Sequence, residues 1–130
     1  MPKDELKRVA RARLSDARAL LDASRFDGAV YLCGYAIEVA LKARICQNLR
    51  WPEYIVGGKY HSLKTHDLDV LLSFSGTEAY TKTQDLAEWN EVCEWDPEVR
   101  YEAIGTALPA RAERMVAAAK TLLEYWLRAI

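Results

Sequence analysis

Glu38 is the residue whose type and position most clearly suggest a chemical role, because it is the only charged residue between Gly28 and Leu41. Its neighbours are so uniformly apolar that they predict a buried helix. An unpaired buried carboxylate is costly, so Glu38 must be paired, protonated or turned toward a cleft. It shares one helical stripe with Tyr31, Tyr35 and Lys42, which makes Lys42 its nearest candidate partner. Two interpretations stay open: a structural ion pair that fixes the register of a bundle, or a carboxylate in a functional cleft.

A second group of polar residues surrounds His66. His61 and His66 lie on either side of Lys64, and Asp67 and Asp69 follow. This histidine spacing does not place both imidazoles on one helical face and no third ligand follows at zinc spacing, so we expect no metal site. There is also no nucleophile-elbow sequence and no glycine-rich phosphate loop, and we expect no cofactor. We expect His66 to cap or orient the chain at the next helix, or to touch a ligand.

The third unusual stretch is residues 95–101, where a proline-containing connection places Arg100 near two aromatic side chains, Trp95 and Tyr101. An arginine in acidic surroundings pairs with an internal carboxylate or forms an anion site. We predict that Arg100 lies within salt-bridge distance of Glu38 and that His66 lies near the same cleft.

The elements that must position these residues are all predicted to be helices. Apolar residues recur at spacings of three and four, and no segment alternates as a half-buried strand does. A helix that is apolar nearly all round belongs at the centre of a bundle, and residues 27–48 have this character. The sequence therefore predicts an all-α fold, an up-and-down helical bundle of four long helices plus one short helix, in a single domain over residues 1–130. The long helices cover residues 3–23, 27–48, 78–94 and the segment after residue 108, and the short helix carries residues 68–72.

Helix ends and connections are also predicted. Asp27, Thr65 and Thr106 are candidate N-caps, Gly76 ends the short helix, and Pro109 lies in the first turn of the last helix. Two connections separate the helices: a loop over residues 50–65 and an extended segment over residues 98–105.

Composition and charge exclude some classes of function. With 51% hydrophobic residues the chain is not disordered, and a net charge of −1 gives it no overall electrostatic attraction to nucleic acid or acidic membranes. The charges are unevenly distributed: residues 1–25 carry seven cations against four acids, and residues 78–102 carry eight acids against two cations. We expect these two segments to attract one another inside the fold or across a dimer.

The cysteines and the hydropathy of the sequence indicate the cellular compartment in which we expect the protein. Cys33, Cys46 and Cys93 are an odd number without close pairs or zinc-ligand spacing, so we expect buried thiols in a reducing compartment. The first residues show no signal peptide, and the apolar run over residues 29–41 is too short to span a bilayer. We therefore expect a cytoplasmic protein without a membrane partner.

Three stretches, taken in order, resemble a prokaryotic HEPN domain. They are the segment AVYLCGYAIEVALKA at residues 29–43, the segment THDL at residues 65–68 with the leucines that follow, and the segment WDPEVRY at residues 95–101. The resemblance spans nearly the whole chain. It implies an up-and-down helical bundle, usually a homodimer, that is often encoded beside a minimal nucleotidyltransferase in toxin–antitoxin modules.

Many members of that family are metal-independent RNases that use an arginine followed, after four to six residues, by a histidine. In this sequence no histidine follows Arg100 at any of those positions, and Arg50 is too far from His61 to replace the motif. Without the imidazole of that motif there is no evident acid or base for RNA cleavage. The RNase activity therefore does not carry over, and we predict no catalytic residue.

The resemblance nevertheless places several side chains on the recurrent polar positions of the family, around a nucleotide-sized pocket. We predict a non-catalytic HEPN-like module that binds a nucleotide, RNA or a nucleotidyltransferase partner. The alternatives are a metal-independent RNase toxin that uses a non-standard histidine such as His66, and a purely structural interaction protein. The candidate cleft residues are Tyr31, Tyr35, Glu38, Lys42, His66, Asp67, Arg100 and Tyr101.

Overall fold

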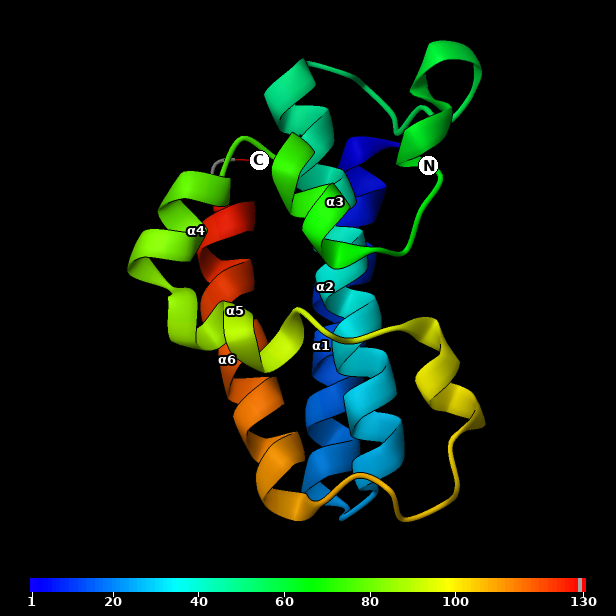
Figure 1. Ribbon diagram of the computed structural model, residues 1–130, viewed down its shortest axis with the longest axis vertical. Helices are drawn as coiled ribbons and strands as arrows, with labels where there is room; N and C mark the ends of the chain where they lie inside the picture. Colours follow the sequence, from blue (N-terminus) through cyan, green and yellow to red (C-terminus); the bar gives the residue numbers. More distant parts are fainter. Residues whose placement is uncertain (129) are drawn as a thin grey trace.

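The computed structural model describes residues 1–128 and residue 130, apart from the side chain of Arg100. Throughout this part of the chain the regular elements are helices, and one isolated β-bridge joins Pro2 to Glu53. The prediction of an all-α bundle is thus confirmed (Figure 1). None of the helices in the described part is long and apolar enough to cross a bilayer. In chain order the elements are α1 (Lys3–Asp22), α2 (Phe26–Leu49), the 3-10 helix η1 (Gly58–Leu63), α3 (Leu68–Phe74), α4 (Glu78–Gln84), α5 (Leu86–Val92), the 3-10 helix η2 (Pro97–Tyr101) and α6 (Pro109–Leu127).

Helix α2 is the centre of the bundle, as its all-round apolar character predicts. Thirteen of its 24 residues are buried, and α1, α3, α6 and η2 all pack against it. Helix α1 runs antiparallel to α2, whereas α6 runs parallel to it (Figure 1). The Lys3 ammonium donates to the Gln47 side chain at 3.0 Å, which ties the start of α1 to the end of α2.

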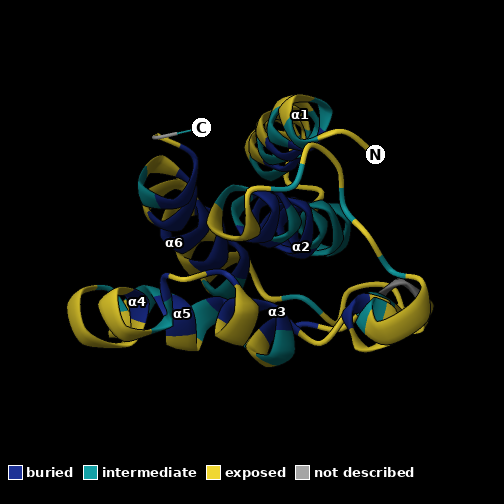
Figure 2. Cartoon of the chain, turned by 90° about the horizontal axis from the view of Figure 1, so that it is seen from above, coloured by how far each residue is buried: buried dark blue, intermediate teal, exposed yellow. Residues whose placement is uncertain are grey.

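Helices α3, α4 and α5 form a second layer, on the side of α2 and α6 that faces away from α1 (Figure 2). Trp89 of α5 and Trp126 of α6 meet edge to face with ring centroids 6.2 Å apart. The Trp126 indole also donates to Thr81 Oγ1 at 3.1 Å, so a buried hydroxyl of α4 is satisfied. The basic α1 and the acidic residues 78–102 therefore lie on opposite sides, and among the described residues no ion pair joins them. Direct pairing of these segments inside the fold is therefore not found among the described residues, and pairing across a dimer stays a prediction.

The predicted helix over residues 78–94 is divided at Asp85 into α4 and α5. Asp85 leaves the helical region with φ −124° and ψ 33°. The residues before it include Thr81 and Thr83, whose branched side chains weaken a helix. The break lets Thr81 reach Trp126 while Trp89 and Val92 still pack into the core. Packing in both halves outweighs the continuity that periodicity predicts.

The three predicted N-caps, Asp27, Thr65 and Thr106, are wrong. Other residues occupy the N-cap positions of these helices, and the three side chains make other hydrogen bonds. Helix α2 begins at Phe26, and the Asp27 carboxylate instead accepts from the Gly105 and Ala107 N–H groups at 2.6 and 2.9 Å. Thr106 donates to a carbonyl of its own loop, and α6 follows Leu108 with Pro109 in its first turn, as predicted.

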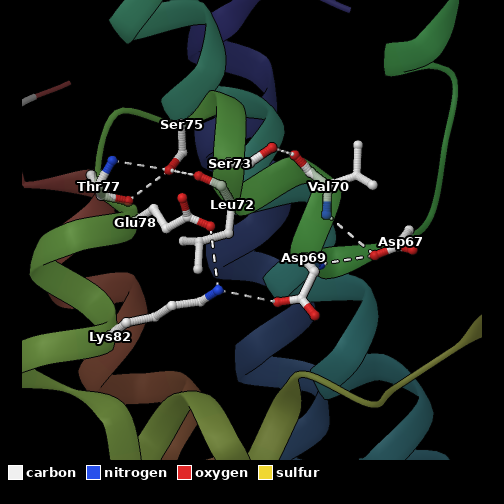
Figure 3. Close-up of polar contacts among 9 residues, drawn as sticks. All are labelled: Asp67, Asp69, Val70, Leu72, Ser73, Ser75, Thr77, Glu78 and Lys82. Carbon is white, nitrogen blue, oxygen red and sulfur yellow. Dashed lines mark hydrogen bonds and ion pairs between the residues drawn. The ribbon is translucent and has the colours of Figure 1, made fainter.

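At α3 the N-cap is Asp67 rather than Thr65. The Asp67 carboxylate accepts from the Asp69 and Val70 N–H groups at 3.0 and 3.2 Å (Figure 3). Thr65 Oγ1 accepts from the Asp67 N–H at 3.0 Å, one step earlier in the chain. At the other end of α3, Gly76 has φ 78°, a left-handed value that suits glycine, and the prediction that it ends the helix is confirmed.

The two predicted connections also contain short regular elements. The loop over residues 50–65 includes η1, and the segment expected to be extended includes most of η2. Of the three cysteines, Cys33 and Cys46 are buried as predicted, whereas Cys93 is half-buried.

Candidate functional site

The candidate site is built around Glu38, whose side chain is only 3% exposed in the middle of α2. One carboxylate oxygen, Oε2, accepts from the Lys42 ammonium at 3.0 Å. The other, Oε1, lies 2.7 Å from Nδ1 of His66. The buried carboxylate is therefore paired on both oxygens, which offsets the cost of removing it from water.

Two helices bring these groups together. Glu38 and Lys42 are one turn apart on α2, so their side chains meet on the same face. His66 lies two residues before α3, where Thr65 and Asp67 form consecutive side-chain hydrogen bonds to the backbone. Because α3 packs on α2, the capped start of α3 carries the imidazole onto the carboxylate.

Tyr54 closes the Lys42 end of the site. The Lys42 ammonium lies 5.4 Å from the centre of the Tyr54 ring, within the range of a cation–π contact. The Tyr54 hydroxyl donates to the Leu63 carbonyl at 2.7 Å, which ties the loop after α2 to the end of η1. Burial raises the pKa of Tyr54 above its usual range, and the nearby Glu38 carboxylate adds to this effect. Tyr54 is therefore a neutral hydrogen-bond donor here.

At the opposite end of the stripe, Trp95 packs against Gly34. A Cβ placed on Gly34 would come within 2.1 Å of the indole ring, so only glycine permits this contact. The Tyr31 ring is 6.2 Å from the same indole, centre to centre, and Tyr35 is half-buried against the core between the two ends. Trp95 thus fixes the chain between α5 and η2 against α2.

A groove of about 590 Å³ runs between the start of α3 and the end of α5. Its walls carry the exposed imidazole of His66 together with Lys64, and Trp95 lines it from the core side. The carboxylates along the groove are those of Asp67, Asp69, Glu94 and Asp96. Across the part of the chain that the structure describes, no three His, Cys, Asp or Glu side chains gather as a metal site would require.

The groove itself carries two basic side chains, Lys64 and His66, among several acceptors. Asp67 uses one oxygen, Oδ1, to cap α3, and Asp96 uses Oδ1 to accept from the Glu98 N–H at 2.8 Å. Asp69 is 3.8 Å from the Lys82 ammonium, which also pairs with Glu78 (Figure 3). Each of these carboxylates keeps capacity to accept further hydrogen bonds, since an ionised carboxylate has about four acceptor positions.

Sequence reasoning identified part of this arrangement. The Glu38–Lys42 pair is present as its spacing predicts, and His66 lies beside the same carboxylate. The predicted pair of Glu38 with Arg100 concerns a side chain outside the described residues. Tyr101 is in η2 and 71% exposed, and Asp67 is a helix cap.

Two contributors, Tyr54 and Gly34, were missed, and the direct bond of His66 to Glu38 was not predicted although His66 was placed near the same cleft. His66 was expected to cap or orient a helix or to touch a ligand, not to bond to Glu38 directly, because residues 28 apart in sequence give no spacing signal. Tyr54 sits in an irregular loop, which gave no signal either. Gly34 did carry one, since a lone glycine inside an apolar helix indicates a close approach by another group.

The chemistry available to this arrangement is that of an oriented imidazole. An ionised carboxylate only accepts hydrogen bonds, so Nδ1 of His66 is the donor to Glu38. The other ring nitrogen, Nε2, has no hydrogen-bond partner among the described residues, and the side chain is 64% exposed. A histidine held in this way can exchange a hydrogen bond or a proton with a bound molecule at Nε2.

Comparison with known proteins gives the family of the chain. The family model of the HEPN domain matches residues 4–130, nearly the whole chain. The chain therefore belongs to the HEPN domain family, which indicates a function related to nucleotides or RNA. No curated protein and no solved structure gives a significant match.

Proposed function

We propose that this chain is a non-catalytic HEPN module that binds a nucleotide or a short stretch of RNA in the groove beside His66. The observation that carries the proposal is the exposed imidazole, oriented through Nδ1 by a buried carboxylate and presenting Nε2 at the wall of a groove. A groove of about 590 Å³ is within the usual size range of small-molecule sites.

The pairing itself favours a binding role. Lys42 alone already neutralises Glu38, at 3.0 Å and with only 18% of its side chain exposed. A second partner that is 64% exposed adds little burial, and ion pairs that reach into water contribute little stability. Holding a solvent-facing imidazole in one orientation is, in contrast, what recognition of a polar ligand requires.

The groove matches the polar groups of a nucleotide. His66 and Lys64 are donors for phosphate oxygens. Asp69, Glu94 and Asp96 are acceptors for ribose hydroxyls and for the amino groups of bases. Because acids outnumber bases here, we expect modest affinity and recognition of the base and sugar as much as of the phosphate.

The test is equilibrium binding of fluorescent single-stranded RNA and of nucleotides, measured by fluorescence anisotropy without added metal. His66→Ala and Glu38→Gln should each weaken binding about tenfold or more, because a lost polar contact to a charged ligand group costs about 1.5–3 kcal/mol. His61→Ala is the matched control, since His61 is exposed on η1 and does not line the groove. Equal binding by all four proteins would contradict the proposal.

The same imidazole favours a second candidate function, a metal-independent RNase. A carboxylate that holds Nδ1 and leaves Nε2 free is the arrangement by which a histidine acts as general base. His66 would take the proton from a ribose 2′-hydroxyl, whose oxygen would bond to the adjacent phosphorus as the bond to the 5′-oxygen breaks, and the protonated imidazole would return the proton to that leaving oxygen. Incubation of end-labelled RNA with the native chain distinguishes the two functions: cleavage that His66→Ala abolishes supports the RNase, and binding without cleavage supports the module.

The proposal also includes the assembly that the family resemblance implies: a homodimer, with a nucleotidyltransferase as further partner in a toxin–antitoxin pair. Ile104 is fully exposed and Leu108 is 66% exposed. They flank the loop whose Gly105 and Ala107 N–H groups bond to Asp27, so apolar surface is available for such contacts. Light scattering should give twice the chain mass, and Ile104→Glu with Leu108→Glu should give a monomer. A monomeric native chain would contradict the homodimer.

A further inference from the structure

A second groove is lined by residues of α1 and α6. Helix α1 lies on the side of the bundle away from α3, α4 and α5 (Figure 2). The volume of the groove is about 450 Å³. Leu14 of α1 with Val116 and Leu123 of α6 form an apolar floor. Arg11, Arg18 and Lys120 stand around this floor, and all three are exposed.

The charge of the groove is only partly compensated. Elsewhere on α1, Arg8 pairs with Glu5 at 2.7 Å and Arg13 with Asp16 at 3.2 Å. Within the part of the chain that the structure describes, Arg11 and Lys120 have no ion-pair partner, and Arg18 reaches Asp22 only at 3.6 Å. Glu124 is the one acid that lines the groove among the described residues. An apolar floor with a basic rim remains open to a ligand of opposite charge.

The shape of the groove suits a helix. Its lining extends from Arg11 to Arg18 on α1 and from Val116 to Glu124 on α6, a length of about 11–12 Å or two helical turns at 1.5 Å per residue. Two turns accommodate apolar anchors at positions i, i+3 or i+4, and i+7 of a docked helix. Such a helix would complete a layer that α1 and α6 leave open.

We propose that the groove between α1 and α6 binds an amphipathic helix of a partner protein, with leucine-like anchors on the floor and acidic residues against Arg11, Arg18 and Lys120. The charges favour this occupant over a second copy of the chain. Isologous pairing of two copies would bring the three cations of one groove against those of the other. Pairing of the groove with the acidic residues 78–102 of another copy would be heterologous and would not give a two-fold dimer, because α1 lies on the opposite side of the bundle from α4 and α5 (Figure 2).

This docking surface is separate from the groove beside His66. The two grooves share no lining residue. Occupation of the groove between α1 and α6 therefore leaves the nucleotide groove accessible, and the inference does not depend on the proposed function.

The test uses three synthetic peptides of about four turns with the same spacing of anchors. One carries leucine anchors with glutamate flanks, the second replaces the glutamates by lysines, and the third replaces the leucines by serines. Fluorescence anisotropy should show binding of the first peptide alone to the native chain, and this binding should weaken as salt is raised from 50 to about 300 mM.

Variants locate the contact. Arg11→Glu with Lys120→Glu should weaken the glutamate peptide about tenfold or more, since each reversed rim charge replaces an attraction by a repulsion. The matched control is Arg8→Glu with Arg25→Glu, which makes the same change in net charge at exposed positions outside the groove. Circular dichroism confirms that both double variants fold.

Binding of the leucine–glutamate peptide that only the groove variant loses supports the proposal. Three results would overturn it: no binding of that peptide, equal binding of the lysine peptide, or equal loss in the control variant. Salt-sensitive self-association of the native chain that the groove variant abolishes would also overturn it, since the occupant would then be a second copy.

Discussion

Replacing Gly34 by alanine should dislodge Trp95 from α2. The new Cβ would lie 2.1 Å from two atoms of the indole and 2.2 Å from Nε1, far inside van der Waals contact. Trp95 is 7% exposed and belongs to the hydrophobic core. The ring cannot slide freely, so either α2 or the segment after α5 must move.

The magnitude follows from three contributions. Forcing extra volume into a packed core costs about 1–3 kcal/mol, and complete loss of the buried tryptophan from its position would cost about 3–5 kcal/mol. Alanine in place of glycine returns about 1 kcal/mol of helix propensity. With the indole displaced, the free energy of unfolding should fall by about 2–4 kcal/mol, which is the loss of the buried tryptophan less the gain in helix propensity and corresponds to a decrease in Tm on the order of 10 °C for a chain of this size.

The assay is urea unfolding followed by circular dichroism, with Gly28→Ala as the matched control. Gly28 is on the same helix, but its nearest contact is a flexible methyl group of Leu20 at 3.1 Å. This variant should change stability by less than about 1 kcal/mol. In a Trp95→Ala background, Gly34→Ala should no longer destabilise, since the clashing ring is absent.

Two outcomes would refute this reasoning. Unchanged stability of Gly34→Ala in the native background would show that Trp95 does not lie on α2. If Gly34→Ala destabilised equally with and without Trp95, the indole contact would not be the cause.

Three further predictions concern the polar contacts. Glu38→Ala should lower the free energy of unfolding by about 2 kcal/mol because Lys42 loses its partner, and Glu38→Gln by less; equal urea midpoints for both would contradict this. Asp67→Ala should cost about 1 kcal/mol through loss of the α3 cap, and an unchanged midpoint would remove the cap's assigned role. The Gly105 and Ala107 N–H groups lower the pKa of Asp27. Their contribution to the free energy of unfolding is fully present above the pKa that Asp27 has in the unfolded chain, and it is lost as pH falls through the lowered pKa of the folded chain. Unfolding at pH 7 and pH 3 should therefore show a steeper acid loss for the native chain than for Asp27→Asn, and parallel losses would contradict it.

Hydrophobic periodicity was sufficient for the long elements. The central place of α2 followed from its all-round apolar surface, because a helix without a polar face must be covered on every side. The break at Asp85 could not be predicted this way. It depends on the pairing of Thr81 with Trp126, residues 45 apart in sequence.

The caps show the same limit. A cap is a local signal only when nothing else competes for the side chain, and Asp27 is engaged by the backbone of residues 105 and 107. At α3 the prediction named Thr65, whereas Asp67 caps the helix and Thr65 bonds to the Asp67 N–H one step earlier. The sequence therefore predicted the type of residue that caps a helix but not the position that does so.

For the site, sequence spacing identified Glu38 as a carboxylate that needed a partner and found Lys42, one turn away. It could not find the bond from His66, which exists only because α3 packs on α2. The groove walls come from the segments around residues 66 and 95, which are far apart in the sequence.

The central claim, that the imidazole of His66 contacts a nucleotide or RNA, is tested most directly by nuclear magnetic resonance of the histidine rings. The chain has two histidines, so the signals of His66 and His61 can be assigned with one variant. Titration with a mixed-sequence single-stranded RNA and with nucleotides should shift the ring signals of His66 and leave those of His61 in place. Ring signals of His66 that do not move at saturating RNA and nucleotide would contradict the account.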